Sequence, residues 1–167
     1  GADILLIAPQ PYDDHRTTAL LAGSVTALET LGVWEDCRTH ATRLKSIRIV
    51  DDTRRLLRAP EVAFAAAEIG LAAFGCNIES RHLVAALSAR AAELKLARLD
   101  EVALGVTSDA AGVTIKLKNG TARARLAIGA DGQHSLARAA AGIGVRRRSY
   151  PQTALTLNLA HARSHND

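Results

Sequence analysis

The sequence is poor in several residue types, and each scarcity narrows the functions that it can support. Aromatic residues make up 3% of the 167 residues, so stacking platforms for single-stranded nucleic acid are nearly absent. The two cysteines, Cys37 and Cys76, give neither a disulfide framework nor the spacing of metal ligands. No apolar run is long enough to cross a bilayer, and no signal peptide opens the chain. We therefore expect a cytoplasmic protein with no nucleic-acid partner and no metal.

Methionine is absent altogether, and both ends of the sequence lie beside strand-like patterns. The chain opens with "GADILLIAP" and closes with "NLAHARSHND", so we expect an internal fragment of a longer protein. The net charge is +4, and the cations are scattered apart from Arg146, Arg147 and Arg148. An anionic cofactor accounts for several of these arginines better than nucleic acid does.

The spacing of apolar residues predicts the first elements. The runs 3–8 and 45–51 are typical of strands, and helical spacing predicts helices over 16–32 and 79–94. We expect residues 53–60, after the strand at 45–51, to form a basic loop. The Ala-rich segment 61–75 fits either a helix or a broken strand.

Short β-like runs fill the sequence between 95 and 129. Asn119-Gly120 predicts a two-residue hairpin turn with positive φ at both residues, and the last run predicts a strand that ends at Gly129. A helix over 135–141 and an extended segment from 149 follow. This order predicts the α/β class, with a mainly parallel sheet that carries an antiparallel β-meander. Ligands of such sheets bind beyond the carboxyl ends of the strands.

The stretch "LAIGADGQHSLARAA", residues 126–140, ends an apolar run on an acid between two glycines. One interpretation is a plain strand-to-helix turn, in which Asp131 or Ser135 caps the helix. The other is one wall of a cofactor site, because glycines let the backbone approach a diphosphate and a helix N-terminus favours an anion. Taken alone, the stretch favours the capping interpretation.

The part "GADGQHSLAR" resembles, residue for residue, a motif of the FAD-dependent aromatic hydroxylases, the p-hydroxybenzoate hydroxylase-like superfamily. In that motif a strand ends in Asp-Gly, and Ser and then Arg follow. The resemblance implies a partial Rossmann-like FAD-binding domain. It also implies that Asp131, Gly132, Ser135 and Arg138 lie where FAD and the nicotinamide cofactor are handled.

Two arginines lie at the starts of predicted helices, and at Arg16 the cation opposes the helix dipole and is better placed if it faces an anion. Arg16 begins "RTTALL", which resembles the ubiquinone-biosynthesis branch of the superfamily, the polyprenyl-phenol hydroxylases. There the corresponding arginine contacts the FAD diphosphate. Arg81, before "HLVAAL", resembles a basic position near the ribitol and phosphates of the flavin. A solvated surface arginine is the alternative at both positions.

The segment "SYPQTALTLNLAHARSH", residues 149–165, is similar to the passage from the FAD domain into the substrate sheet of the same branch. The alternative is an ordinary strand with a proline at its start. His161 and His165 would share one side of that strand, but no further metal ligands are evident. The resemblance divides the chain into a partial FAD-binding domain, 1–148, and the start of a substrate-domain strand, 149–167.

Several features of the superfamily are missing from the sequence. They are the first strand with its Gly-x-Gly-x-x-Gly turn, a later Gly-Asp-Ala motif and most of the substrate domain. Ala8 also stands where the superfamily has an acid for a ribose hydroxyl, so Asp13 or Asp14 would have to replace that acid. No residue is a convincing catalytic acid, base or nucleophile.

The resemblance implies part of a monooxygenase that hydroxylates an aromatic ring with FAD, NADH or NADPH, and O₂. In the ubiquinone branch the ring belongs to a polyprenyl phenol, and a peripheral membrane contact would help the whole protein to reach it. Two alternatives remain: another FAD enzyme of the superfamily, such as a halogenase or prenyl reductase, and a non-catalytic α/β binding or scaffold module. Without the first strand, the strand at 3–8 has an open edge, so we expect this chain to self-associate and to carry no FAD.

Overall fold

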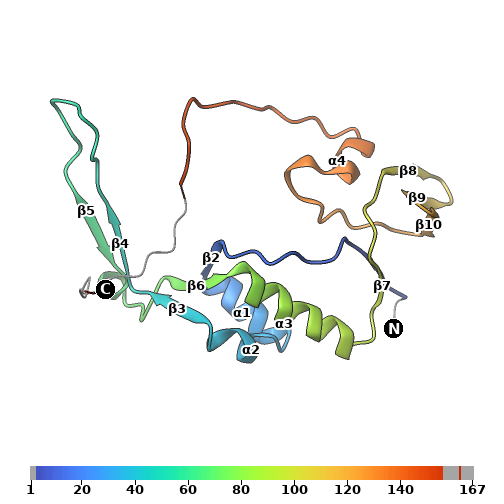
Figure 1. Ribbon diagram of the computed structural model, residues 1–167, viewed down its shortest axis with the longest axis horizontal. Helices are drawn as coiled ribbons and strands as arrows, with labels where there is room; N and C mark the ends of the chain where they lie inside the picture. Colours follow the sequence, from blue (N-terminus) through green and yellow to red (C-terminus); the bar gives the residue numbers. More distant parts are fainter. Residues whose placement is uncertain (1–2, 156–161, 163–167) are drawn as a thin grey trace. The chain divides into compact units, whose positions relative to one another are not determined.

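The computed structural model describes residues 3–155 and 162, and Figure 1 labels its helices and strands. The chain forms two compact units. Unit 1 contains residues 3–11 and 95–154, and unit 2 contains residues 12–94. The division differs from the boundary at 148 and 149 that the sequence predicts, and that boundary stays a prediction.

Unit 2 is built around a three-stranded antiparallel sheet in which β6 lies between β2 and β3. Its elements are β2 (Thr17–Leu21), α1 (Ala22–Thr30), α2 (Trp34–Arg38), β3 (Ala41–Leu44), β4 (Ser46–Ile49), β5 (Val62–Ala65), the 3-10 turn η1 (Ala66–Ile69), β6 (Gly75–Glu79) and α3 (Ser80–Glu93). The three helices and the sheet share one hydrophobic core, whose buried members are Leu20, Leu28, Val33, Cys37, Ile78 and Ala86. The predicted helix over 79–94 and the predicted strand over 45–51 are confirmed as α3 and β4.

The predicted helix over 16–32 is wrong in its first part. Residues Thr17–Leu21 form β2, and α1 begins at Ala22. The β-branched Thr17 and Thr18 favour an extended backbone, and β6 offers this segment a full row of hydrogen-bonding partners. Gly32, at φ 70°, follows the helix, as the sequence predicts. Arg16 therefore precedes a strand and not a helix.

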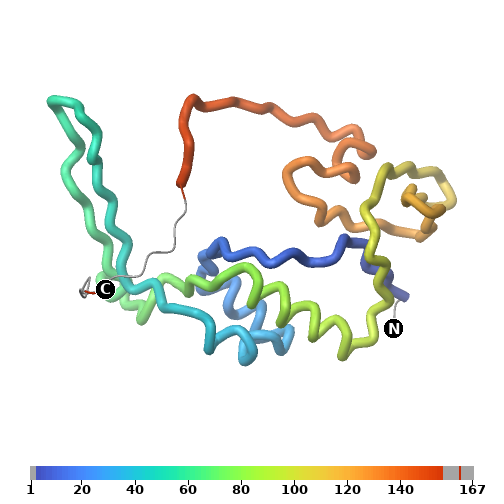
Figure 2. The backbone as a smooth tube through the Cα atoms, viewed as in Figure 1, coloured from blue at the N-terminus to red at the C-terminus, as the bar shows by residue number. Residues whose placement is uncertain are grey.

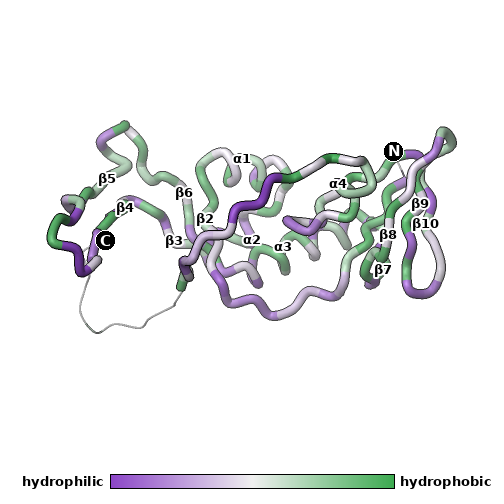
Figure 3. The backbone as a smooth tube through the Cα atoms, turned by 90° about the horizontal axis from the view of Figure 1, so that it is seen from above, coloured by the Kyte–Doolittle hydropathy of each residue, from purple (hydrophilic) through white to green (hydrophobic). Residues whose placement is uncertain are grey.

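The ribbon of β4 and β5 is the most exposed part of unit 2. The two antiparallel strands run side by side and are joined by residues 50–61 (Figure 2), and the predicted loop over 53–60 is confirmed within this connection. Hydrophobic and hydrophilic residues lie next to each other along the ribbon and its loop (Figure 3). The ambiguous segment 61–75 contains β5, η1 and the first residue of β6.

Unit 1 has a short parallel sheet and an antiparallel meander. Its elements are β1 (Leu5–Ile7), β7 (Ala97–Leu99), β8 (Gly105–Asp109), β9 (Gly112–Leu117), β10 (Gly120–Ala124), the 3-10 turn η2 (Gly132–His134) and α4 (Leu136–Ala140). β1 pairs in parallel with β7, and the meander has the order β10-β9-β8. The α/β class and the meander are confirmed. Among the described residues the other ladders are antiparallel, so the parallel share is smaller than expected.

Two local expectations in unit 1 need correction. The β9–β10 hairpin forms, but its loop is Lys118-Asn119, and the positive φ falls on Gly120 at 135°. The last predicted strand stops at Ala124, and no strand ladder of the described chain includes residues 126–131. A strand needs a neighbour for its backbone donors and acceptors, and the apolar run 126–128 has none there.

The carboxyl-terminal expectations are tested in part. The predicted helix over 135–141 is confirmed as α4. Residues 149–155 form no strand, and the remainder of the predicted strand, with His161 and His165, lies outside the described residues. In the described chain, no helix combines the length and the apolar character that crossing a membrane requires.

Candidate functional site

The two arginines selected from the sequence lie together in unit 2. The backbone N–H of Ser80 donates to the carbonyl of Arg16, and the N–H of Arg81 donates to the carbonyl of Asp14. The antiparallel register of β2 on β6 causes this contact, because Thr17 lies opposite Glu79. The first two N–H groups of α3 are therefore already satisfied by the chain.

Arg16 is held by the acid two residues before it. Its Nε lies 2.8 Å from Asp14 Oδ1 and its Nη2 lies 2.7 Å from Asp14 Oδ2, a bidentate pair. Nη2 also donates to the Tyr12 hydroxyl at 2.7 Å. This guanidinium lowers the pKa of Asp14 to about 2, and the carboxylate raises the pKa of Arg16 above its usual range. The side chain of Arg16 remains 70% exposed.

Arg81 has a carboxylate partner of its own. Its Nε lies 2.7 Å from Glu79 Oε2, close enough for an ion pair, although the angles do not make a hydrogen bond. Asp13 Oδ1 lies 3.9 Å from Arg81 Nη1. His15 lies between two of the acids, 3.1 Å from Asp13 and 3.4 Å from Glu79.

We call this set the arginine–carboxylate cluster: Asp13, Asp14, Arg16, Glu79 and Arg81. Two arginines face three carboxylates, so the cluster is not a plain cationic patch. Sequence reasoning missed Glu79, although its position two residues before Arg81 on an extended segment that enters a helix was a usable signal. Of the acids proposed to replace Ala8, Asp14 is occupied by Arg16, whereas the side chain of Asp13 is well exposed.

The other four predicted residues lie in unit 1, in the turn between β10 and α4. The Asp131 carboxylate accepts the N–H groups of Leu136 and Ala137, and the Ser135 hydroxyl accepts the N–H of Arg138 at 3.0 Å. A hydrogen bond from the Ser135 hydroxyl is the strongest influence that lowers the pKa of Asp131, and the bonds from the N–H groups of Ala137 and Leu136 lower it further. Both residues act as helix caps, which was one of the two interpretations of the motif.

The glycines and the arginine of this turn also have structural causes. A Cβ on Gly129 would lie 2.5 Å from the Cβ of Ala137, so a side chain there would force the turn off α4. Gly132 has φ 75°, which favours glycine, and a Cβ there would meet open space. Arg138 Nη2 donates to the carbonyl of Gln133 at 2.7 Å and closes the turn.

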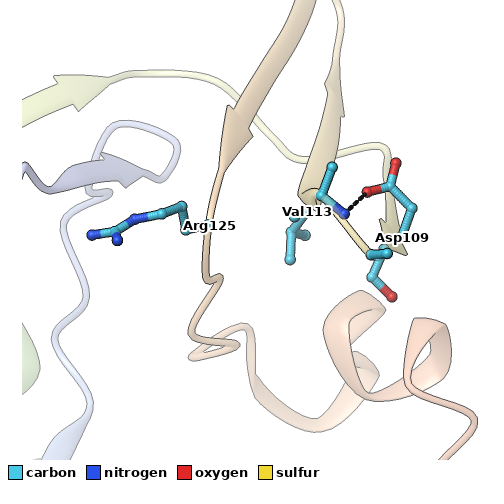
Figure 4. Close-up of a pocket in the computed structure, with 7 residues that line it drawn as sticks. Asp109, Val113 and Arg125 are labelled. Carbon is cyan, nitrogen blue, oxygen red and sulfur yellow. Dashed lines mark hydrogen bonds between the residues drawn. The ribbon is translucent and has the colours of Figure 1, made fainter.

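A pocket of about 340 Å³ lies beside the β8–β9 turn of unit 1. Asp109 lines it and accepts the N–H of Ala111 at 2.7 Å, whereas the side chain of Arg125 is directed away from Asp109 (Figure 4). No residue selected from the sequence lines this pocket. Asp109 is the one carboxylate that lines the pocket, and it is already bonded within the turn. The pocket therefore offers no pair of groups for acid–base catalysis.

Metal-binding arrangements are also absent from the part of the chain that the structure describes. No group of three or more His, Cys, Asp or Glu side chains there is placed to hold an ion. His40 and His82 stack with ring centroids 3.8 Å apart and an interplanar angle of 4°. Ring nitrogens hold metals in the plane of the ring, so two parallel stacked rings do not converge on one ion.

The donor set of the cluster suits a ligand with both an anionic and a hydroxyl group. Arg16 uses Nε and Nη2 internally, and its Nη1 has no partner among the described residues. This edge can donate to an anion, and Asp13 can accept from a hydroxyl group. The residues present thus fit a nucleotide through one arginine edge and one exposed carboxylate.

Comparisons with known proteins give this geometry a context. The model of the FAD binding domain family matches residues 5–165. The chain is 36% identical over 155 residues to the ubiquinone hydroxylase UbiL of Rhodospirillum rubrum, covering 91% of this chain and 35% of that protein. It is 33% identical over 149 residues to the 3-demethoxyubiquinol 3-hydroxylase of Escherichia coli, covering 87% of this chain and 37% of that protein. The chain thus spans about a third of the length of these relatives.

Solved structures agree on the fold. The Diels-Alderase PyrE3 of pyrroindomycin biosynthesis superposes with a TM-score of 0.64 at 18% identity, over 85% of this chain and 30% of that one. The anhydrotetracycline hydroxylase OxyS of Streptomyces rimosus gives 0.63 at 21% identity, over 85% and 29% of the two chains. At these identities the likeness concerns the fold alone.

Proposed function

Because the chain belongs to the family of FAD-binding domains, we propose that it works in a flavoprotein monooxygenase that hydroxylates a polyprenyl phenol in ubiquinone biosynthesis. The observation that carries the proposal is the identity of 33% and 36% to two ubiquinone-pathway hydroxylases over nearly the whole of this chain. NADH or NADPH as reductant and O₂ as oxidant belong to the same proposal. So does a peripheral contact of the whole protein with the membrane that holds such a substrate.

The residues of this chain would bind and orient the cofactor. FAD, when bound, supplies redox chemistry that amino-acid side chains lack. Arg16 is the proposed diphosphate contact through Nη1, and Asp14 fixes the plane of its guanidinium. Asp13 is the proposed acceptor for a ribose hydroxyl, and Arg81 is a second cation near the phosphates.

We assign a positioning role to the turn 129–138. Asp131 and Ser135 fix its shape through the caps of α4, and Arg138 closes it through the Gln133 carbonyl. Gly132 presents backbone without a side chain, with open space around it. A turn of this kind lets a planar cofactor approach the main chain closely.

The decisive experiment uses the protein encoded by the reading frame that carries these residues. We expect copurified FAD, and hydroxylation of a polyprenyl phenol that depends on NADH or NADPH and consumes O₂. Arg16→Ala should weaken FAD binding about tenfold or more, since a charge-assisted hydrogen bond to phosphate is lost, and Arg16→Lys should restore part of it. Arg38→Ala is the matched control, because Arg38 is an exposed arginine that pairs with Glu35. A flavin-free protein, or a product without a new hydroxyl group, would reject the proposal.

The 167 residues by themselves are proposed to pair with a second copy and to carry no flavin. β1 pairs with β7 along one edge, and its other edge has no partner in the described chain. An unpaired edge with exposed Leu5 and Leu6 is a template for another strand. Light scattering should report more than one copy per particle. A monomer, or a stoichiometric yellow flavin spectrum, would contradict this expectation.

A further inference from the structure

The loop between β4 and β5 presents two leucines that nothing in the described chain covers. Leu56 and Leu57 have exposed fractions of 101% and 87%. Three arginines flank them in the sequence "TRRLLR", residues 53–58. We call these six residues the hairpin tip.

Contacts made by residues on either side of the hairpin tip fix the shape of the loop. The Asp51 carboxylate accepts the N–H of Thr53 at 3.0 Å and that of Ala59 at 3.1 Å, so it joins the two sides of the loop. Arg48 in β4 pairs with Glu61, the residue directly before β5. These contacts fix the shape of the loop that carries the two leucines.

The charges of the tip are partly available. Arg58 lies 3.5 Å from Asp52. In the described chain, neither Arg54 nor Arg55 has an ion pair or a hydrogen bond. Two uncompensated guanidinium groups thus stand next to two uncovered aliphatic side chains.

This combination fits one occupant, the surface of an anionic lipid bilayer. Aliphatic side chains enter the boundary between headgroups and acyl chains, while neighbouring arginines bind lipid phosphates. A second copy of the tip would bring like charges together, and the tip has no aromatic ring on which a nucleic-acid base could stack. We infer that the hairpin tip docks the protein on anionic lipid bilayers, with Leu56 and Leu57 inserted and Arg54 and Arg55 on the headgroups.

This inference specifies the membrane contact of the proposed function and does not depend on the flavin chemistry. Vesicle flotation of the flavin-free chain tests it, and FAD titration of the whole protein tests the other proposal. Flotation is preferable to sedimentation, because self-associated protein would also form a pellet. The vesicles contain phosphatidylglycerol and phosphatidylcholine, one part to three, or phosphatidylcholine alone.

We expect flotation with the anionic vesicles that weakens as salt rises. Leu56→Asn/Leu57→Asn should lower the partition coefficient at least roughly tenfold, because each leucine loses its transfer into the lipid. Arg54→Gln/Arg55→Gln should reduce binding to anionic vesicles and weaken its salt dependence. Both variants change exposed loop residues, and circular dichroism checks that they fold.

Matched controls separate the tip from exposed residues in general. Leu126→Asn/Ile128→Asn changes two aliphatic side chains that are 74% and 86% exposed in unit 1, and Arg146→Gln/Arg147→Gln changes another adjacent arginine pair. Both controls should bind like the original chain. The inference is overturned if the original chain does not float with anionic vesicles, or if the tip variants float as well as the controls. It is also overturned if the tip variants change the oligomeric state without lipid, since the leucines would then contact protein.

Discussion

Ile78 is one of the most deeply buried residues in the core of unit 2, so shortening its side chain tests the fold directly. Ile78 is 1% exposed, in the central strand β6, and it faces residues from α1, α2 and α3 in the core. It also directly precedes Glu79, the partner of Arg81. A loosened β6 would therefore disturb both the core and the arginine–carboxylate cluster.

The expected magnitude follows from the methyl groups removed. Ile78→Val deletes one methyl group and should cost about 1 kcal/mol of unfolding free energy, whereas Ile78→Ala should cost about 2–5 kcal/mol because a cavity remains. At about 4–8 °C per kcal/mol for a unit of this size, the alanine variant should lower Tm by roughly 8–40 °C. The matched control is Ile69→Ala at the end of η1, where the isoleucine is 66% exposed, and it should cost under about 1 kcal/mol.

Trp34 provides the assay. It is the one tryptophan of the chain and packs against this core, so its fluorescence during guanidinium unfolding reports on unit 2. The midpoint should fall in the order original, valine, alanine, with an unchanged slope. Equal midpoints for Ile78→Ala and Ile69→Ala would refute the placement of Ile78 at the centre of the core.

Three further predictions concern the site and its supports. Arg16 holds Asp14 as a carboxylate and lowers its pKa to about 2. The stability that this pair contributes is present above the ordinary pKa of 3.8 and is lost as pH falls toward 2. Asp14→Asn should remove this part of the loss of stability when the unfolding free energy is followed in an acid titration. Ser135→Ala removes a cap of α4 and should cost that helix about 1 kcal/mol, seen as faster amide hydrogen exchange in its first turn, whereas Ser135→Asn should keep the protection. Gly75→Ala would place a methyl group 1.9 Å from the Leu20 carbonyl oxygen, so circular dichroism should report loss of the β2–β6 pairing, and a native spectrum would contradict the register.

The local features of the fold could be predicted from the sequence because they depend on neighbouring residues. The periodicity of residues 79–94 predicts α3, and Asn119-Gly120 marks the β9–β10 hairpin although the loop itself is one residue earlier. The acid and the serine of "GADGQHSLAR" are cap residues at the spacing that a helix start requires. The same motif identified the FAD-binding family, which the family match confirms.

Long-range pairing decided the rest. Residues 17–21 carry helical spacing but form a strand, because β6 supplies backbone partners from nearly sixty residues away. Because of that pairing, Arg16 lies beside Asp14 and Arg81 and not at the start of a helix, where the sequence predicts it. The apolar run 126–128 shows the converse, since it has the composition of a strand but no neighbouring strand in the described chain.

By itself, then, the sequence determined the elements that satisfy their own backbone and the motif that carries the family. Only the tertiary structure decided that Arg16 and Arg81 lie together, because the register of β2 on β6 brings residues 14–16 to the start of α3 from more than sixty residues away. It also decided that Leu56 and Leu57 remain uncovered, because burial depends on what the rest of the chain packs against.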